Sequence, residues 1–198
     1  MSQYGAYISG LYPVDYHTET AATAIQDNIP GQNGKRLALI SFDYLCGSTA
    51  HTMCLMAAKG TGTRTTASAA AAAAQKVLNV TDAPKDPAGN ATASGDIIAY
   101  QLPDGTWEFN TVASLSTLAI TLTTNIAVAV ASGAAVRIFG VVGDGATHNI
   151  GLTASVVTQL SGHIIAVSPY KGDPMVMYDA NATAAGFLNN AVWAYINK

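Results

Sequence analysis

Short segments of alternating apolar and polar residues, separated by turn sequences, constrain the fold of this chain most. From residue 35 onward such segments recur at roughly 8–12-residue spacing, which is typical of β-sandwiches and barrels. Leu118, Ile120 and Leu122 alternate mainly with threonines, the pattern of a strand buried on one face. Pro-Asp-Gly at 103–105 is a turn sequence, because proline pre-sets φ and glycine accepts a positive φ. The sequence therefore predicts a mainly β protein, an antiparallel β-sandwich or barrel.

Two hairpins are expected on either side of that region. The first pairs residues 35–45 with 51–59, and the second pairs 153–160 with 163–168. If the first loop is symmetric, Cys46 faces His51 and Cys54 faces Asp43, so the two thiols are not cross-strand partners. A disulfide needs Cα atoms within about 7 Å. We therefore expect two reduced, buried cysteines.

The N-terminal segment differs from the rest in composition. Residues 1–34 show no sustained period and are rich in tyrosine, glycine, proline, threonine and asparagine. We expect an extended arm over 1–34 and a single β-rich domain over 35–198. Tyrosine offers much contact area at low entropic cost. The arm either contacts a partner or packs on its own domain, and the candidate contact residues are Tyr4, Tyr7, Tyr12 and Tyr16.

Two helices are predicted. Residues 69–74 are six alanines, and alanine is the best helix former, so a short helix is expected near 66–76. The alternative is a close-packed strand against a neighbouring subunit, because alanine offers little side chain to anchor a helix. Near the C-terminus, apolar residues recur at helical spacing from Ala184 through Phe187 and Ala191 to Tyr195, which predicts a C-terminal helix.

Charge is scarce. Charged residues make up 11% of the chain, against about a quarter in typical soluble domains. Nine lysines and arginines are dispersed along a chain of net charge −3, so no basic patch for nucleic acid is expected. Residues 65–74 and 115–136 contain no charged side chain. We expect these two stretches in the core or under a neighbouring subunit, because few charges would need to be desolvated there.

Membrane insertion and secretion are not expected. The most apolar stretch, 126–143, is interrupted by Arg137. That residue would cost roughly 2.5 kcal/mol or more at the centre of a bilayer. Residues 1–10 lack the basic and apolar regions of a signal peptide. We expect synthesis in a host cytoplasm.

No residue pattern predicts catalysis, a cofactor or a metal site. His51, Cys54 and Cys46 supply three candidate ligands near one another, whereas a structural zinc site takes four. A hairpin could bring Asp96 and Asp104 to Glu108, and paired carboxylates hydrolyse glycosides. However, Asp104 belongs to the turn and Asp96 precedes a strand. We expect no enzyme. The remaining candidate is Trp107, which stands beside Glu108 as in glycan-binding surfaces.

Residues 95–140 carry a resemblance. They contain a strand led by Gly-Asp, the Pro-Asp-Gly hairpin, an Ile-Thr-Leu-Thr strand, an Ala-rich link ending in Ser-Gly and a Val-Arg-Ile-Phe-Gly strand. This order resembles the head-decoration or cement proteins of tailed-bacteriophage virions. The resemblance implies a homotrimer or other symmetric oligomer that binds the major capsid protein at the capsid surface and stabilises the lattice. The alternatives are a receptor- or glycan-binding fibre or adhesin module and another virion component such as a tail protein.

Overall fold

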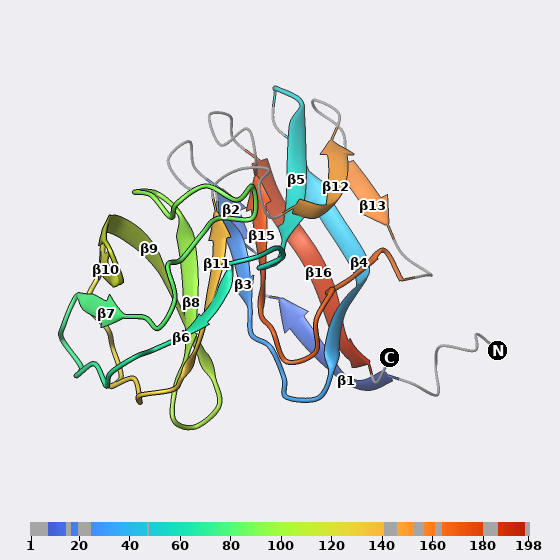
Figure 1. The fold of residues 1–198 in the computed structure, drawn as a ribbon. Helices are drawn as coiled ribbons and strands as arrows, with labels where there is room; N and C mark the ends of the chain where they lie inside the picture. Colours follow the sequence, from blue (N-terminus) through green and yellow to red (C-terminus); the bar gives the residue numbers. More distant parts are fainter. Residues whose placement is uncertain are drawn as a thin grey trace. The chain divides into compact units, whose positions relative to one another are not determined.

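All regular elements in the described residues are β-strands (Figure 1). The computed structural model describes residues 8–14, 17–19, 25–46, 48–140, 146–152, 157–160, 164–179 and 186–196. The chain divides into two compact units. Unit 1 comprises Met1–Met56 and Ala146–Lys198, and unit 2 comprises Ala57–Gly145. In the described residues, no helix has the length and apolar character that a membrane span requires.

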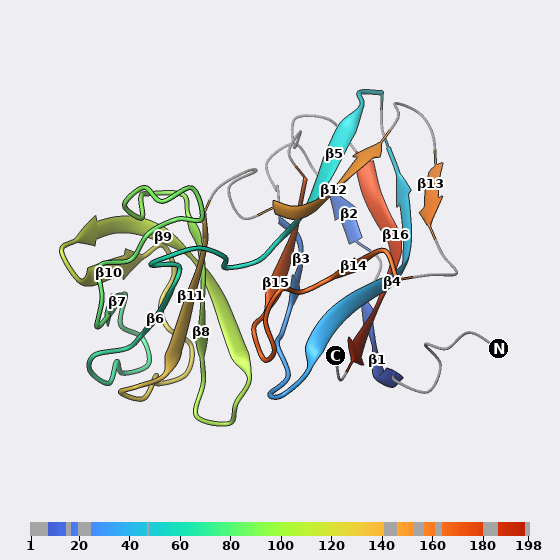
Figure 2. The same ribbon diagram turned by 45° about the vertical axis from the view of Figure 1, so that its right-hand side comes forward.

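Unit 1 contains two antiparallel sheets, which the turned view separates (Figure 2). The first sheet has the order β1-β16-β4-β13, with β2 paired to β16 and β14 paired to β4. Its strands are β1 (Ile8–Val14), β2 (His17–Glu19), β4 (Arg36–Leu45), β13 (Val157–Leu160), β14 (Ala166–Val167) and β16 (Gly186–Ile196). The second sheet has the order β12-β5-β15-β3. Its strands are β3 (Ile25–Ile29), β5 (His51–Met56), β12 (Ala146–Leu152) and β15 (Met175–Asp179).

Unit 2 is a single six-stranded antiparallel sheet of order β6-β11-β8-β9-β10-β7. Its strands are β6 (Arg64–Thr66), β7 (Val77–Asn79), β8 (Ile97–Gln101), β9 (Trp107–Ser116), β10 (Ala119–Leu122) and β11 (Ala135–Gly140). The two outer strands continue into a bridge between Ala67 and Val80, with a hydrogen bond from the Ser68 amide to the Asn79 carbonyl at 2.9 Å. The sheet therefore closes on itself as a small barrel, which leaves no long open edge.

The barrel has its own apolar core, and its alternating strands supply it. Ile98 and Tyr100 of β8, Ile120 of β10 and Ile138 of β11 are fully buried in this core. The predicted hairpin around 103–105 is confirmed: β8 pairs with β9, and Gly105 has a φ of 85°. The fold prediction of a mainly β antiparallel protein is likewise confirmed.

Unit 2 is inserted into a hairpin of unit 1. β5 ends at Met56 and β12 begins at Ala146, and these two residues are Cα partners in the antiparallel ladder. The chain thus leaves unit 1 and re-enters it at adjacent points. Insertions of this kind are tolerated because the ends of the inserted domain lie close together. The sequence predicts a boundary at residue 34, whereas the compact units divide after Met56 and after Gly145.

This insertion predicts that the barrel folds alone. A fragment of residues 57–145 is expected to unfold cooperatively on heating and to show dispersed amide resonances, because every residue of its core cluster belongs to this unit. Circular dichroism and proton–nitrogen NMR spectra test this. The matched control is the same fragment with Ile138→Asp, which places an unpaired charge in that core. A wild-type fragment that resembles the control would contradict the prediction.

The first predicted hairpin is wrong. β4 pairs with β16, β13 and β14, whereas β5 pairs with β12 and β15 in the other sheet. The loop after Cys46 therefore crosses between sheets. Cys54 is opposite Asn149 and Tyr178 rather than Asp43. Both cysteines are free and buried, as predicted.

The second predicted hairpin also differs. β13 and β14 pair with successive parts of β4, one after the other along the same strand, rather than with each other. The sequence at 161–162 resembles a turn, but both segments form their backbone hydrogen bonds with the longer strand β4.

The predicted C-terminal helix is wrong, because residues 186–196 form β16. This strand has partners on both sides, β4 on one and β1 with β2 on the other. Asn189 has no partner in the β4 ladder, and the register shifts there. Such a bulge moves apolar residues to the other phase of the alternation. The interrupted alternation, together with the central place of β16 in its sheet, gives the sequence an apolar spacing close to that of a helix.

The predicted alanine helix near 66–76 is also wrong. Residues 64–66 form β6, Ala71 forms an isolated bridge with Val130, and Ala74 has a φ of 67°. Tertiary pairing overrides the helix propensity of alanine here. The extended N-terminal prediction lies partly within the described residues: β1, β2 and β3 pair with β16 and β15, so they belong to the sheets of unit 1.

Candidate functional site: an uncharged face on the inserted barrel

The predicted contact tyrosines lie largely outside the described residues. Tyr4, Tyr7 and Tyr16 fall there entirely. Tyr12 is part of β1, where its backbone is opposite Trp193, and its side chain is outside the described part. These four residues remain a prediction.

The predicted glycan-binding pair is not assembled as one surface. The Arg137 guanidinium lies 5.6 Å from the centroid of the Trp107 ring, a cation–π distance. Trp107 and Glu108 are successive residues of β9, so their side chains point to opposite faces of the sheet. The Glu108 carboxylate accepts hydrogen bonds within the barrel, from the Tyr100 hydroxyl at 2.6 Å and the Ala127 amide at 2.9 Å.

The three carboxylates of this hairpin are engaged separately. Asp96 accepts a hydrogen bond from the Ala93 amide at 2.8 Å. Asp104 accepts from the Thr106 hydroxyl and amide, and these bonds lower the pKa of its carboxyl group. Glu108 is bound as described above. No carboxylate pair forms among these three, and the described residues contain no group of three or more His, Cys, Asp or Glu that could hold a metal ion.

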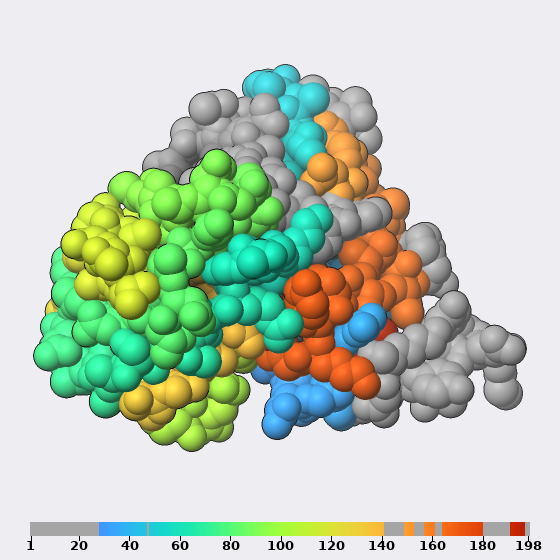
Figure 3. Space-filling model, viewed as in Figure 1, coloured from blue at the N-terminus to red at the C-terminus, as the bar shows by residue number. Residues whose placement is uncertain are grey.

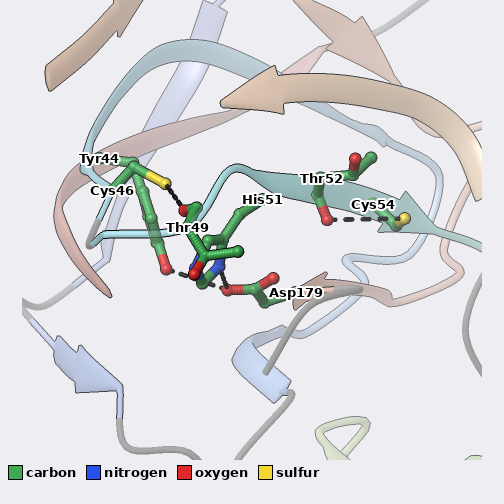
Figure 4. A network of polar contacts seen from close by, with 7 residues as sticks. All are labelled: Tyr44, Cys46, Thr49, His51, Thr52, Cys54 and Asp179. Atoms are coloured by element: carbon green, nitrogen blue, oxygen red, sulfur yellow. Dashed lines mark hydrogen bonds and ion pairs between the residues drawn. The ribbon is translucent and has the colours of Figure 1, made fainter. Parts of the chain in front are cut away.

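A buried polar network lies in unit 1 (Figure 4). Asp179 Oδ2 on β15 accepts a hydrogen bond from the Tyr44 hydroxyl on β4 at 3.0 Å. The same oxygen lies 2.5 Å from His51 Nδ1 on β5. The Tyr44 and Asp179 residues are 0% exposed and His51 is 3% exposed. The network therefore joins one strand of the first sheet to two strands of the second.

Within the described part of the chain, this network contains no activated nucleophile. A hydrolytic triad needs a hydroxyl or thiol hydrogen-bonded to the second histidine nitrogen. His51 Nε2 is buried and has no hydrogen-bond partner in the described structure. The Cys46 thiol donates instead to the Thr49 carbonyl at 2.9 Å. Burial raises the pKa of both Cys46 and Cys54, and the Asp179 carboxylate adds to this effect, so neither thiol gains the thiolate character of a reactive cysteine.

Sequence reasoning missed this network. Its partners His51 and Asp179 are 128 positions apart. His51 was considered for zinc with neighbouring cysteines, but nothing near it in the sequence points to β15. The pairing of β15 with β5 brings Asp179 opposite Met53, two residues from His51.

The two charge-free stretches meet on the barrel. Ala71 and Val130 exchange both backbone hydrogen bonds, at 3.0 and 2.9 Å, and the Ala74 amide donates to the Ile126 carbonyl at 2.8 Å. Ala71, Ile126 and Val130 are buried in the barrel core. In Figure 3 the green and gold surfaces of the two segments adjoin. Part of each stretch therefore forms core, as one alternative predicted, and the other residues face outward; their burial under a neighbouring subunit stays a prediction.

We name the exposed residues at 68–74 and 127–133, which flank the paired Ala71 and Val130, the uncharged face. Its members are Ser68, Ala69, Ala70, Ala72, Ala73, Ala74, Ala127, Val128, Ala129, Ala131, Ser132 and Gly133. Val128 is the largest of them and is 50% exposed. A surface of small side chains without charge can be covered at little desolvation cost. It also allows a partner backbone to approach closely.

The comparisons with known proteins add little. No protein-family model and no curated protein matches this sequence. Among solved structures, VP17, a capsid protein of bacteriophage P23-77, aligns with a TM-score of 0.20 and 10% sequence identity. That alignment covers 95% of this chain and 99% of VP17. A TM-score of 0.20 does not establish a shared fold.

Proposed function

We propose that this protein is a non-enzymatic structural component of a virion that binds an assembled capsid lattice and stabilises it, as decoration or cement proteins do. The observation that carries the proposal is the uncharged face. Its exposed alanines and Val128 lie on an inserted barrel that closes its own sheet. A protein that binds the assembled lattice and not free subunits stabilises the lattice by mass action.

The proposed partners are the major capsid protein and further copies of this chain in a symmetric oligomer, at the capsid surface. A symmetric oligomer repeats each weak contact, so it binds a repeating lattice more tightly than one copy would. Two observations make a catalytic role less suitable: among the described residues the buried His51 Nε2 has no hydrogen-bond partner, and burial raises the pKa of both thiols. The resemblance of residues 95–140 to decoration proteins supplies the particular role, and the tyrosines at 4, 7, 12 and 16 remain proposed contacts.

The test is co-sedimentation of the purified full chain with empty capsids, together with light scattering of the chain alone. Val128→Lys is expected to weaken capsid binding by a factor of about 30 or more, since an unpaired charge in an interface costs roughly 2 kcal/mol or more. The matched control is Val157→Lys, because Val157 of β13 is also 50% exposed but lies in unit 1.

Two results would contradict the proposal. One is a wild-type chain that does not sediment with capsids at any concentration tested. The other is equal binding by the Val128→Lys and Val157→Lys variants, which would separate the uncharged face from lattice binding. Sedimentation with tails instead of capsids would assign the chain to another part of the virion.

A further inference from the structure

The loop at residues 127–129 has an unusual support. Its two anchors, Ile126 and Val130, are buried and paired by backbone hydrogen bonds to Gln75 and Ala71. Between these anchors, Ala127, Val128 and Ala129 are exposed and form part of the uncharged face. In the described residues, no backbone carbonyl accepts from the Ala127 or Val128 amide.

Glu108 supplies the missing acceptors. Its Oε1 accepts from the Ala127 amide at 2.9 Å, and its Oε2 lies 3.4 Å from the Val128 amide, which donates to it. The Tyr100 hydroxyl donates to the same Oε1 at 2.6 Å from the barrel core. Two successive amides form a concave site for an anion, and bonds to a charged acceptor are stronger than neutral ones.

We propose that Glu108 is the positioning residue of the uncharged face, and this inference rests on the proposed function. The carboxylate binds the backbone amides of the 127–129 loop and so fixes the position of Val128. The exposed side chains of the loop themselves carry no charge. Tyr100 orients the carboxylate by occupying the side of Oε1 that faces the core. A loop fixed before binding loses less entropy when a partner covers it.

The neighbouring loop at residues 72–74 is held by a different side chain. Gln75 Oε1 accepts from the Ala72 amide at 3.2 Å. The chain therefore contains a matched pair of supports, one charged and one neutral. Glu108→Gln should release the 127–129 loop and leave the Ala72 amide bound. Gln75→Ala should do the reverse.

The experiment measures amide hydrogen exchange by NMR in both full-chain variants. In Glu108→Gln, an NH2 group replaces one carboxylate oxygen, so one of the two loop amides faces a donor instead of an acceptor. The remaining neutral oxygen is also a weaker acceptor than a carboxylate oxygen. Exchange at Ala127 and Val128 is expected to rise on the order of tenfold, the effect of one lost hydrogen bond. Exchange at Val130, which is paired to Ala71, is expected to stay unchanged. Capsid co-sedimentation by the same variant is expected to weaken by a similar factor.

The outcomes are distinct. Unchanged exchange at Ala127 and Val128 overturns the inference, as does an equal rise in Gln75→Ala. Freed amides with undiminished capsid binding overturn it too. A wild-type chain that binds no capsid, but whose loop is freed in Glu108→Gln, refutes the proposed function and leaves the structural support intact. If Glu108→Gln does not fold, the inference is tested in the unmutated protein by the NMR scalar coupling across the hydrogen bond, between the Ala127 amide nitrogen and the Glu108 carboxyl carbon. Its absence in the unmutated protein contradicts the inference.

Discussion

Asp179→Ala is expected to lower the free energy of unfolding by about 3–5 kcal/mol, the loss measured when a buried pair is broken. The reason is the arrangement of three side chains from two sheets. Removing the carboxylate leaves the Tyr44 hydroxyl and His51 Nδ1 without their shared acceptor, in a region where these residues are almost wholly buried. A cavity adds to that loss.

Urea denaturation followed by the fluorescence of Trp193 measures this change in unit 1. Trp107→Phe serves as the background, since the chain has two tryptophans. Tyr44→Phe alone is expected to cost about 1–2 kcal/mol, because it removes one donor and leaves the carboxylate bound to His51. The Tyr44→Phe and Asp179→Ala double variant is expected to cost less than the two single losses added together. Additive losses would contradict a shared network, and Asp82→Ala, at an exposed carboxylate, is the control.

Alkaline pH is expected to destabilise unit 2 through Tyr100. Burial, and then the hydrogen bond to the Glu108 carboxylate, raise the pKa of this tyrosine above the ordinary value of 10. The folded state therefore keeps a proton that the unfolded state releases. The contribution of Tyr100 to the free energy of unfolding is fully present below pH 10. Above pH 10 this contribution falls by about 1.4 kcal/mol per pH unit until the pKa of Tyr100 in the folded state is reached.

Comparison with Tyr100→Phe isolates this effect from the other tyrosines. At pH 7 the variant is expected to be less stable by about 1–2 kcal/mol, because the hydroxyl no longer donates to Glu108. Between pH 10 and 12 the wild-type protein should lose this advantage and become the less stable of the two. Urea denaturation at unit pH steps measures the difference. A difference that stays constant from pH 9 to pH 12 would show that Tyr100 does not titrate differently in the two states.

Local signals in the sequence predicted local structure well. The turn at 103–105 placed β8 against β9, since proline and glycine act within a few residues of themselves. The mainly β class followed from the same short alternating segments. Free, buried cysteines were also predicted correctly, although the hairpin from which they were inferred does not form.

Long-range pairing could not be predicted in this way. β4 and β5 are neighbours in sequence, yet their partners β16, β12 and β15 come from the C-terminal half of the chain. A bulge at Asn189 interrupts the alternation along β16, and the sequence pattern of this strand therefore predicted a helix. The alanine run was decided by its pairing with Val130 rather than by propensity. The two charge-free stretches were recognised in the sequence, but their meeting on one face required the barrel.

The insertion of the barrel between β5 and β12 has a consequence for the order of folding. In a disordered chain, bringing Met56 to Ala146 would close a loop of roughly 90 residues, which costs about 3 kcal/mol more than closing a tight turn. In a barrel that has already formed, the Ile138 amide donates to the Thr63 carbonyl, so only short segments separate this pair from Met56 and Ala146. Unit 1 would then meet its distant strands as though they were joined by a short connection, so a slow, entropically costly search becomes a local step. The early barrel would thus bring β5 and β12 of the second sheet together, and mutations that slow barrel formation should delay the assembly of unit 1.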